Sequence, residues 1–369
     1  MLRYFELSWA GFILTAWMAL LPQCKTQKSS GGGSAPTEGS SAGQDQKSDS
    51  PESPASTATV PMGSASLPIG SDEAVQIPQP GEKVSDLPTA PGTKVAAGTL
   101  TSQVWTAAGS PYRVQGDILL PEGASLTVEA GVTIIFEGAY KWTVLGGKLA
   151  FKGTETQAIR LTATLRDPGW YGILFCPDPS CTQEATKGEL DATYTIFEYA
   201  RANDSEGSFR YWRRGGALML LNTARVHIAN STFRYNYASE VGGALELLAI
   251  SNEKTAQLDN LRFFANEAGS GGALRLSHIN ARRWTGLTFI ANRVRAYPDS
   301  YGGAIESEDA NQITLIKVLA RGNTAESTER DQGLGGAFYC YSPGLTLVDP
   351  VELKDNKPET SIGCGTDLP

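Results

Sequence analysis

The sequence predicts an all-β protein folded as a single-stranded right-handed parallel β-helix, because one motif recurs at near-regular intervals and would stack equivalent side chains in columns. Gly-Gly-Ala occurs five times, with separations of 27, 29, 31 and 33 residues, and an asparagine follows each first glycine after 21 or 24 residues. A body of nearly fixed length with one variable gap is typical of a solenoid. The copies start at Gly215, Gly242, Gly271, Gly302 and Gly335, and the asparagines are Asn236, Asn266, Asn292, Asn323 and Asn356.

Each copy begins with a strand pattern. The third and fifth residues after the first glycine are mostly apolar, as at Leu218 and Leu220, whereas the fourth residue varies in character. This period of two is that of a half-buried β-strand. The glycine pair gives the backbone freedom to turn sharply into that strand.

The second half of each copy supplies two internal columns. Phe233, Phe263 and Phe289 stand three residues before their asparagines, and Ala320 and Leu353 replace phenylalanine in the last two copies. Stacked in register, these positions form an aromatic and aliphatic column. The asparagines form a second column, in which each amide can bond to its equivalents above and below.

The chain before the first Gly-Gly-Ala has the same character without the motif. The leading end of a β-helix is a strand edge that needs a cover, and we expect residues 103–120 to provide this cap. Short strands between glycine-containing turns are predicted at residues 126–128, 132–136, 149–151 and 170–175.

The first 24 residues have the features of an export signal. Arg3 precedes an apolar stretch at residues 7–21, which is too short for a comfortable membrane span and has the length of a signal-peptide core. The run Leu-Leu-Pro-Gln that leads to Cys24 resembles the lipobox of bacterial lipoproteins, although Pro22 and Gln23 stand where small residues are usual. We therefore expect lipidation of Cys24 and a lipid-anchored protein at the outer membrane or cell surface. A conventionally cleaved signal peptide and an uncleaved anchor are the alternatives.

Residues 25–97 are predicted to be a disordered tether. They are rich in Ser, Gly, Pro and Thr with almost no aromatic residues, so they cannot bury enough apolar surface to offset the cost of ordering. About 70 residues of such coil have a reach of ~45–50 Å, enough to hold a domain clear of a membrane surface. Residues 98–369 would then form the β-helix.

Composition argues against several kinds of site. A formal net charge of −8 disfavours a nucleic-acid partner, which needs a basic face. The only two histidines are His227 and His278, so neither a zinc site nor His-based catalysis is expected, and no metal or cofactor is predicted.

Four cysteines remain once Cys24 is assigned to the anchor. An even set in an exported domain favours two local disulfides, and four buried free thiols are the alternative. The cysteines are Cys176 and Cys181, which lie close in sequence, and Cys340 and Cys364 near the C-terminus.

The pairing of Gly-Gly-Ala-[Leu/Ile/Phe] with Phe-x-x-Asn resembles the repeats of the chlamydial polymorphic outer-membrane protein family. Three copies match in full, and those that start at Gly302 and Gly335 match in part because they lack the phenylalanine. Residues 131–162 also look like the first coils of bacterial right-handed β-helix lipoproteins with a pectin-lyase-like fold. The resemblance implies a β-helical surface protein and, in several cases, an adhesin. It says less about function, because this fold hosts lyases, hydrolases, adhesins and structural spikes.

The fourth residue after the first glycine is a candidate site position, because it is expected on an exposed sheet face. Glu246, Arg275 and Glu306 would stack there one rung apart, at ~4.8 Å per step. We interpret them as a solvent-exposed ladder in which Arg275 holds both carboxylates ionised. The alternative is an inverting glycosidase with its carboxylates ~9.6 Å apart, but Arg275 would fill the space that the sugar and water need.

Two longer loops, residues 293–301 and 324–334, are expected to extend from the same corner of successive coils. Loops on a rigid scaffold are where binding residues concentrate. Tyr297 and Tyr301, together with a cluster on that corner, are candidates to stack on a sugar or to contact a protein partner. Ordinary packing of these aromatic residues is the alternative. The cluster comprises Tyr211, Trp212, Arg213 and Arg214.

Together these features predict a non-catalytic binding or structural module, adhesin-like, with a carbohydrate or a surface protein as its ligand. The alternative is a pectin-lyase-type polysaccharide lyase or a glycoside hydrolase. The chain lacks a recognisable set of acid and base residues, so we do not expect an enzyme.

Overall fold

The computed structural model describes residues 79–181, 186–204, 210–250, 256–297, 300–327, 333–358 and 361–364. The predicted signal peptide, Cys24 and the predicted tether up to residue 78 lie outside the described residues. Regular structure in the described part is almost entirely β-strand, with two short 3₁₀ helices, η1 (Ala107–Gly109) and η2 (Arg210–Arg213). Within these ranges no helix is long and apolar enough to cross a membrane.

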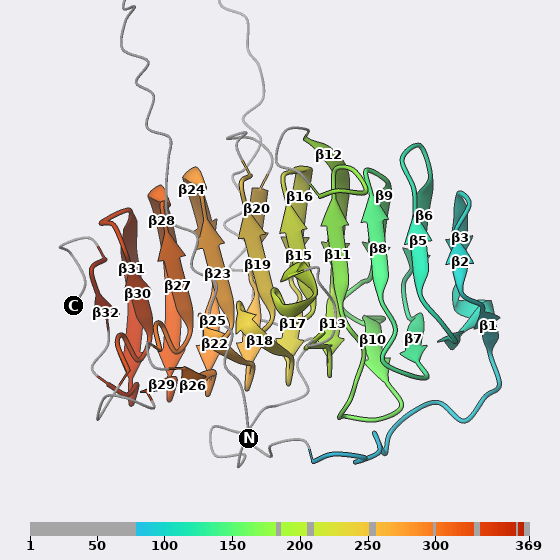
Figure 1. The fold of residues 1–369 in the computed structure, drawn as a ribbon, viewed down its shortest axis with the longest axis horizontal. Helices are drawn as coiled ribbons and strands as arrows, with labels where there is room; N and C mark the ends of the chain where they lie inside the picture. The colour runs from blue at the N-terminus through green and yellow to red at the C-terminus, as the bar shows by residue number, and fades with distance from the viewer. Residues whose placement is uncertain are drawn as a thin grey trace, which may run out of the picture. The chain divides into compact units, whose positions relative to one another are not determined.

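The strands form three sheets along the solenoid, and each turn of the chain adds a rung (Figure 1). The 10-stranded sheet has one strand from each coil. In order, these are β2 (Gly98–Thr99), β5 (Ile118–Leu120), β8 (Trp142–Leu145), β11 (Ile173–Cys176), β15 (Leu218–Leu221), β19 (Leu245–Leu248), β23 (Leu274–Ser277), β27 (Ile305–Glu308), β30 (Phe338–Cys340) and β32 (Ser361–Ile362).

The 17-stranded sheet consists of two rows that merge in the last two strands, because β28 and β31 are long enough to serve both. The first row is β3 (Gln103–Trp105), β6 (Ser125–Glu129), β9 (Lys148–Lys152), β12 (Lys187–Thr193), β16 (Thr223–Ala229), β20 (Ala256–Asp259), β24 (Asn280–Thr285), β28 (Asn311–Arg321) and β31 (Leu345–Lys354). The second row is β1 (Thr93–Val95), β4 (Tyr112–Val114), β7 (Thr133–Phe136), β10 (Ile159–Ala163), β13 (Thr195–Glu198), β17 (Thr232–Arg234), β21 (Arg262–Phe264) and β25 (Thr288–Ile290).

A five-stranded sheet completes the later coils. Pairing between successive coils is parallel, with Leu218 opposite Leu245 and Leu274 opposite Ile305. The predicted all-β parallel β-helix is therefore confirmed. The strands of the third sheet are β14 (Arg201–Ala202), β18 (Tyr237–Val241), β22 (Glu267–Ser270), β26 (Arg293–Tyr297) and β29 (Thr324–Ser327).

The predicted phenylalanine column lies in the core. The ring centroids of Phe233 and Phe263 are 5.1 Å apart, and those of Phe263 and Phe289 are 4.9 Å apart, with nearly parallel planes. Phe197 extends the stack upstream at 4.8 Å from Phe233, and Ala320 continues it opposite Phe289. Equivalent residues of successive coils thus superpose, as the repeat predicts.

The asparagine ladder is also confirmed. The Nδ2 of Asn236 donates to the Oδ1 of Asn266 at 3.0 Å, and the same bond recurs at 2.9, 2.9 and 2.8 Å along the ladder to Asn356. Each Nδ2 also donates to a backbone carbonyl, as that of Asn266 does to Phe233 at 3.0 Å. These buried amides are therefore well satisfied.

The second glycine of each motif has a role beyond the predicted freedom to turn. A Cβ at Gly216 would lie 2.0 Å from the carbonyl oxygen of Gly243, and one at Gly272 would lie 2.2 Å from that of Gly303. Only a residue without a side chain fits such an approach. The glycines are needed for stacking as well as for turning.

The predicted cap at residues 103–120 is wrong for residues 112–120. β4 lies between β1 and β7, and β5 lies between β2 and β8, so both strands are internal rungs. The first coil is β1, β2 and β3, and its strands begin at Thr93. Trp105 stacks on Tyr112 with centroids 4.6 Å apart and helps to close the interior at this end.

Residues 79–92, which we call the strap, pack along the outer side of the second row. The backbone amide of Val84 donates to the carbonyl of Thr164 at 3.1 Å. The guanidinium Nη2 of Arg160 lies 2.9 Å from the Oδ1 of Asp86. This part of the predicted tether is therefore bound to the β-helix.

Candidate functional site

The predicted charge ladder forms on the outer face of the 10-stranded sheet, one residue per rung. Glu246 pairs in register with Arg275, and Arg275 with Glu306. The prediction that these side chains face solvent is wrong, because their residues are 0%, 8% and 3% exposed. The prediction assumed that the outer face of this sheet meets water along its whole length.

Ion pairs on several sides make this burial tolerable. The Nη1 of Arg275 lies 2.9 Å from the Oε1 of Glu246, its Nε lies 3.2 Å from the Oε2 of Glu306, and it also pairs with Glu308. Arg214, from the preceding coil, donates to Glu246 through its Nε at 2.9 Å. The guanidinium of Arg275 thus occupies the space between the carboxylates, and the ladder has no room for a sugar and a water.

Burial dominates the titration of Glu306 and raises its pKa, while the charge of Arg275 acts in the opposite direction. The sequence interpretation considered only Arg275 and omitted this desolvation. Burial also disfavours the charge of Arg275, but the attraction of Glu306, Glu246 and Glu308 outweighs it and raises the pKa of the arginine. The ladder is a structural element of the fold.

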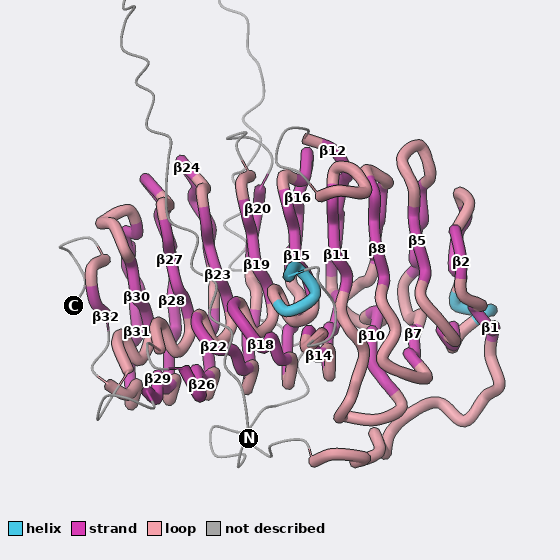
Figure 2. Tube along the Cα trace, in the orientation of Figure 1, coloured by secondary structure: helices cyan, strands magenta, loops and turns pink. Residues whose placement is uncertain are grey.

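The predicted aromatic cluster is divided between two places. Tyr211 and Trp212 lie in η2, beside β15 (Figure 2), and pack on Leu174 and Met219 of the 10-stranded sheet. Tyr301 stacks instead on Tyr339, with centroids 4.4 Å apart. It immediately precedes the motif of the β27 coil, three rungs beyond β15.

The remaining candidates of this group do not share a groove with Trp212. Arg213 pairs with Glu240 at 3.1 Å, and Arg214 belongs to the charge ladder. Tyr297 is the last residue of β26, and its side chain lies outside the described part. Three rungs separate Tyr211 and Trp212 from Tyr301, and a role of these residues in ligand binding stays a prediction.

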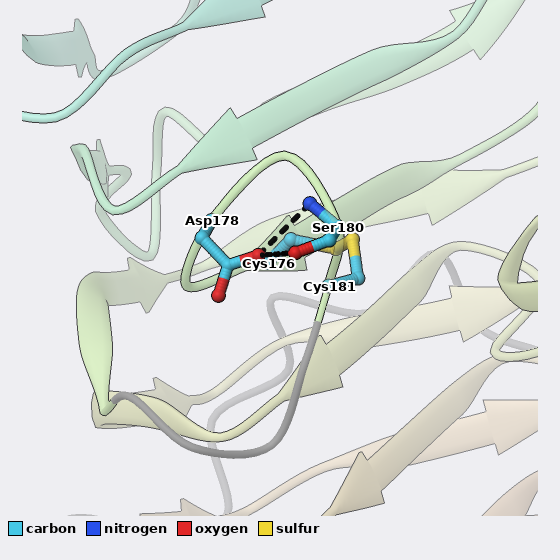
Figure 3. The surroundings of a disulfide bond; sticks show 4 residues. All are labelled: Cys176, Asp178, Ser180 and Cys181. Atoms are coloured by element: carbon cyan, nitrogen blue, oxygen red, sulfur yellow. Dashed lines mark hydrogen bonds between the residues drawn. A yellow bond between two sulfur atoms is a disulfide. The ribbon is translucent and has the colours of Figure 1, made fainter.

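Both predicted disulfides are present, Cys176–Cys181 and Cys340–Cys364. The first closes a short loop at the end of β11 (Figure 3). Within this loop the carboxylate of Asp178 accepts hydrogen bonds from the Ser180 amide at 2.8 Å and from its hydroxyl at 2.6 Å. The bond and the turn fix a rigid wall beside the sheet.

That wall borders a cavity of about 470 Å³ on the outer face of β2, β5, β8 and β11. We call it the groove. Along its floor Thr99, Leu119, Thr143 and Leu174 are register partners, and Leu145 of β8 also lines it. Pro179 and Cys181 of the disulfide loop and Trp212 of η2 also line it. Sequence reasoning missed the groove because these coils lack the Gly-Gly-Ala motif that marks the register downstream.

Lysine and aspartate side chains meet at the edge of the groove. The Nζ of Lys141 lies 2.7 Å from the Oδ2 of the largely buried Asp204. It also lies 5.3 Å from the ring centroid of Tyr171 and 5.5 Å from that of Trp212, which are cation–π distances. The exposed Asp117 accepts a hydrogen bond from the backbone amide of Lys141 at 2.9 Å.

Comparison with known proteins places the groove in the recognisable part of the chain. Residues 98–219 match the family model described as a pectate-lyase like beta helix domain, and every residue that lines the groove falls in this range. No curated protein and no solved structure matches the chain. The protein is thus a parallel β-helix whose first coils are similar to the pectate-lyase-like domain. This fold alone does not decide between an enzyme and a binding protein.

Proposed function

We propose that the β-helix is a non-catalytic module that binds a carbohydrate chain in the groove. The observation that carries the proposal is the groove itself, whose volume of about 470 Å³ falls within the ~300–1,000 Å³ of typical ligand sites. Its floor alternates the hydroxyls of Thr99 and Thr143 with the apolar side chains of Leu119 and Leu174. Sugar rings present the same combination of apolar faces and hydroxyl edges.

The setting of Lys141 favours binding over cleavage. A lyase needs a base that is free to abstract a proton, and proton transfer depends on the position and engagement of that group. The ammonium group of Lys141 is engaged by Asp204 at 2.7 Å and lies within cation–π distance of two aromatic rings. This arrangement suits a Lys141 that helps to position a bound ligand.

Export and anchoring through a lipid on Cys24 belong to the same proposal. The two disulfides support it, because such bonds persist in oxidising compartments outside the cytosol. Labelled fatty acid should be incorporated into the wild-type protein and not into Cys24→Ser, with both forms expressed in a host that processes bacterial lipoproteins. Equal labelling of the two forms would refute the assignment.

The binding proposal is tested by incubating the full chain with a panel of neutral and acidic polysaccharides, scoring retention separately from bond cleavage. Thr143→Arg should fill the groove floor and weaken retention about tenfold or more, the equivalent of ~1.4 kcal/mol. Ile362→Arg is a matched control, because it places the same side chain at an exposed position in the last strand of the same sheet, β32. Cleavage that Thr143→Arg abolishes would establish an enzyme and overturn the non-catalytic part of the proposal.

A further inference from the structure

The charges of the groove indicate which class of carbohydrate it takes, an inference that rests on the proposed function. Among the described residues that line it, the charged side chains are Asp117 and Lys141. The Nζ of Lys141 lies 2.7 Å from Asp204, whose residue is 9% exposed. The positive charge of Lys141 is therefore already balanced by a largely buried carboxylate. The carboxylate of Asp117 is exposed at the groove edge.

A polyuronate such as pectate carries a carboxylate on every ring, and binding it requires cations to balance those charges. The described lining offers Lys141, which Asp204 and the rings of Tyr171 and Trp212 already engage. An incoming polyanion would meet the like charge of Asp117 without a compensating partner. A neutral chain would meet the threonine hydroxyls and leucine faces of the floor at no such cost.

We infer that the groove binds a neutral glycan chain and disfavours polyuronates, although its coils are similar to a domain described as pectate-lyase like. Thr99 and Thr143 lie two rungs apart, ~9.6 Å along the solenoid axis, with Leu119 between them. This spacing provides hydrogen-bonding groups on both sides of an apolar contact.

The test compares retention of the full chain on neutral polysaccharides and on polyuronates, at low and high salt. Wild type should retain a neutral chain more strongly, with little dependence on salt, since screening acts on charges. Asp117→Lys should raise the ratio of polyuronate to neutral retention by about twofold to fivefold, the size of a solvent-screened charge pair. Asp117→Asn keeps an acceptor for the Lys141 amide and should raise this ratio less, so it serves if the lysine variant fails to fold.

Stronger retention on polyuronates by the wild-type chain, or an unchanged ratio in both variants, would overturn this inference and leave the proposed function intact. Retention on neither class, by a chain that unfolds cooperatively, would overturn the proposed function and this inference together.

Discussion

The outer face of the 10-stranded sheet differs between its first and its later coils. Over β2 to β11 it leaves a groove with small and apolar side chains on its floor, whereas over β19 to β27 a buried charge ladder fills it. The backbone register is continuous through both regions. The interior columns thus determine the fold, and the residues of the outer face determine whether a region has a groove or a filled surface.

The interiors of the two regions also differ. Upstream, large aromatic rings of varied geometry fill the core, with Phe136 and Trp170 stacked at 4.3 Å and Trp105 tilted on Trp142 at 5.8 Å. Downstream, phenylalanines stack in one orientation beside the asparagine ladder. The ladder ends at Asn236, whose Oδ1 accepts from the amide of Ala200 in the coil before it.

The largest loss of stability is expected when one ring is removed from the phenylalanine column. Phe263→Ala should lower the free energy of unfolding by about 3–5 kcal/mol, because it removes a fully packed side chain and leaves a cavity. Denaturant unfolding measures this, with the exposed Val104→Ala as the control. A loss below about 1 kcal/mol would mean that the column is not tightly packed.

Breaking the asparagine ladder should cause the next largest loss in the free energy of unfolding. Asn266→Ala leaves the amide of Asn236 and the carbonyl of Phe233 without their partner, and each orphaned group costs about 1–3 kcal/mol. Asn311→Ala, which removes an exposed asparagine contact, should cost less than about 0.5 kcal/mol. Equal losses in the two variants would show that the ladder adds nothing to stability.

The buried charge ladder should make the stability of the protein depend on pH. The pKa of Glu306 is raised in the fold, so folding favours its protonated form. Its contribution to stability is present below the usual carboxyl pKa of 4.5 and is lost as pH rises through the higher folded value. Unfolding of wild type measured from pH 4 to 8 should therefore show a decline with pH that Glu306→Gln lacks. Parallel profiles for wild type and Glu306→Gln would contradict this account.

The smallest loss of stability is expected for a substitution in the strap. A hydrogen bond from Arg160 is the largest influence on Asp86 and lowers its pKa, so its stabilising contribution is present above the usual value of 3.8 and is lost as pH falls through the folded value. Because the Asp86 side chain is 64% exposed, Asp86→Asn should cost about 0.2–1 kcal/mol. Amide exchange of Val84, whose N–H bonds to Thr164, should become faster in this variant. Unchanged exchange would show that the ion pair does not hold the strap.

The interior of this protein could be predicted from its sequence, and its exterior could not. Phe233 and Asn236 follow a repeat, and stacking forces equivalent positions of a repeat together. The burial of Glu246 depends on Arg214, and that of Arg275 depends in part on Glu308, and the repeat relates neither partner to the ladder position. The groove combines residues from four coils with a disulfide loop and η2, an arrangement that no local pattern encodes.

Gly216 closely approaches the carbonyl oxygen of Gly243, and Gly243 approaches that of Gly272 in the same way. This repeated contact implies that the β-helix, a rod of stacked coils, can change length only in whole turns. Excising residues 242–270 would bring Gly216 against the equivalent oxygen of Gly272 and shorten the rod by one step of ~4.8 Å. The groove floor would keep its neighbouring strands, because its last strand, β11, lies two rungs from β19. Duplication or deletion of single units can therefore adjust how far the β-helix extends without altering the strands of the groove floor.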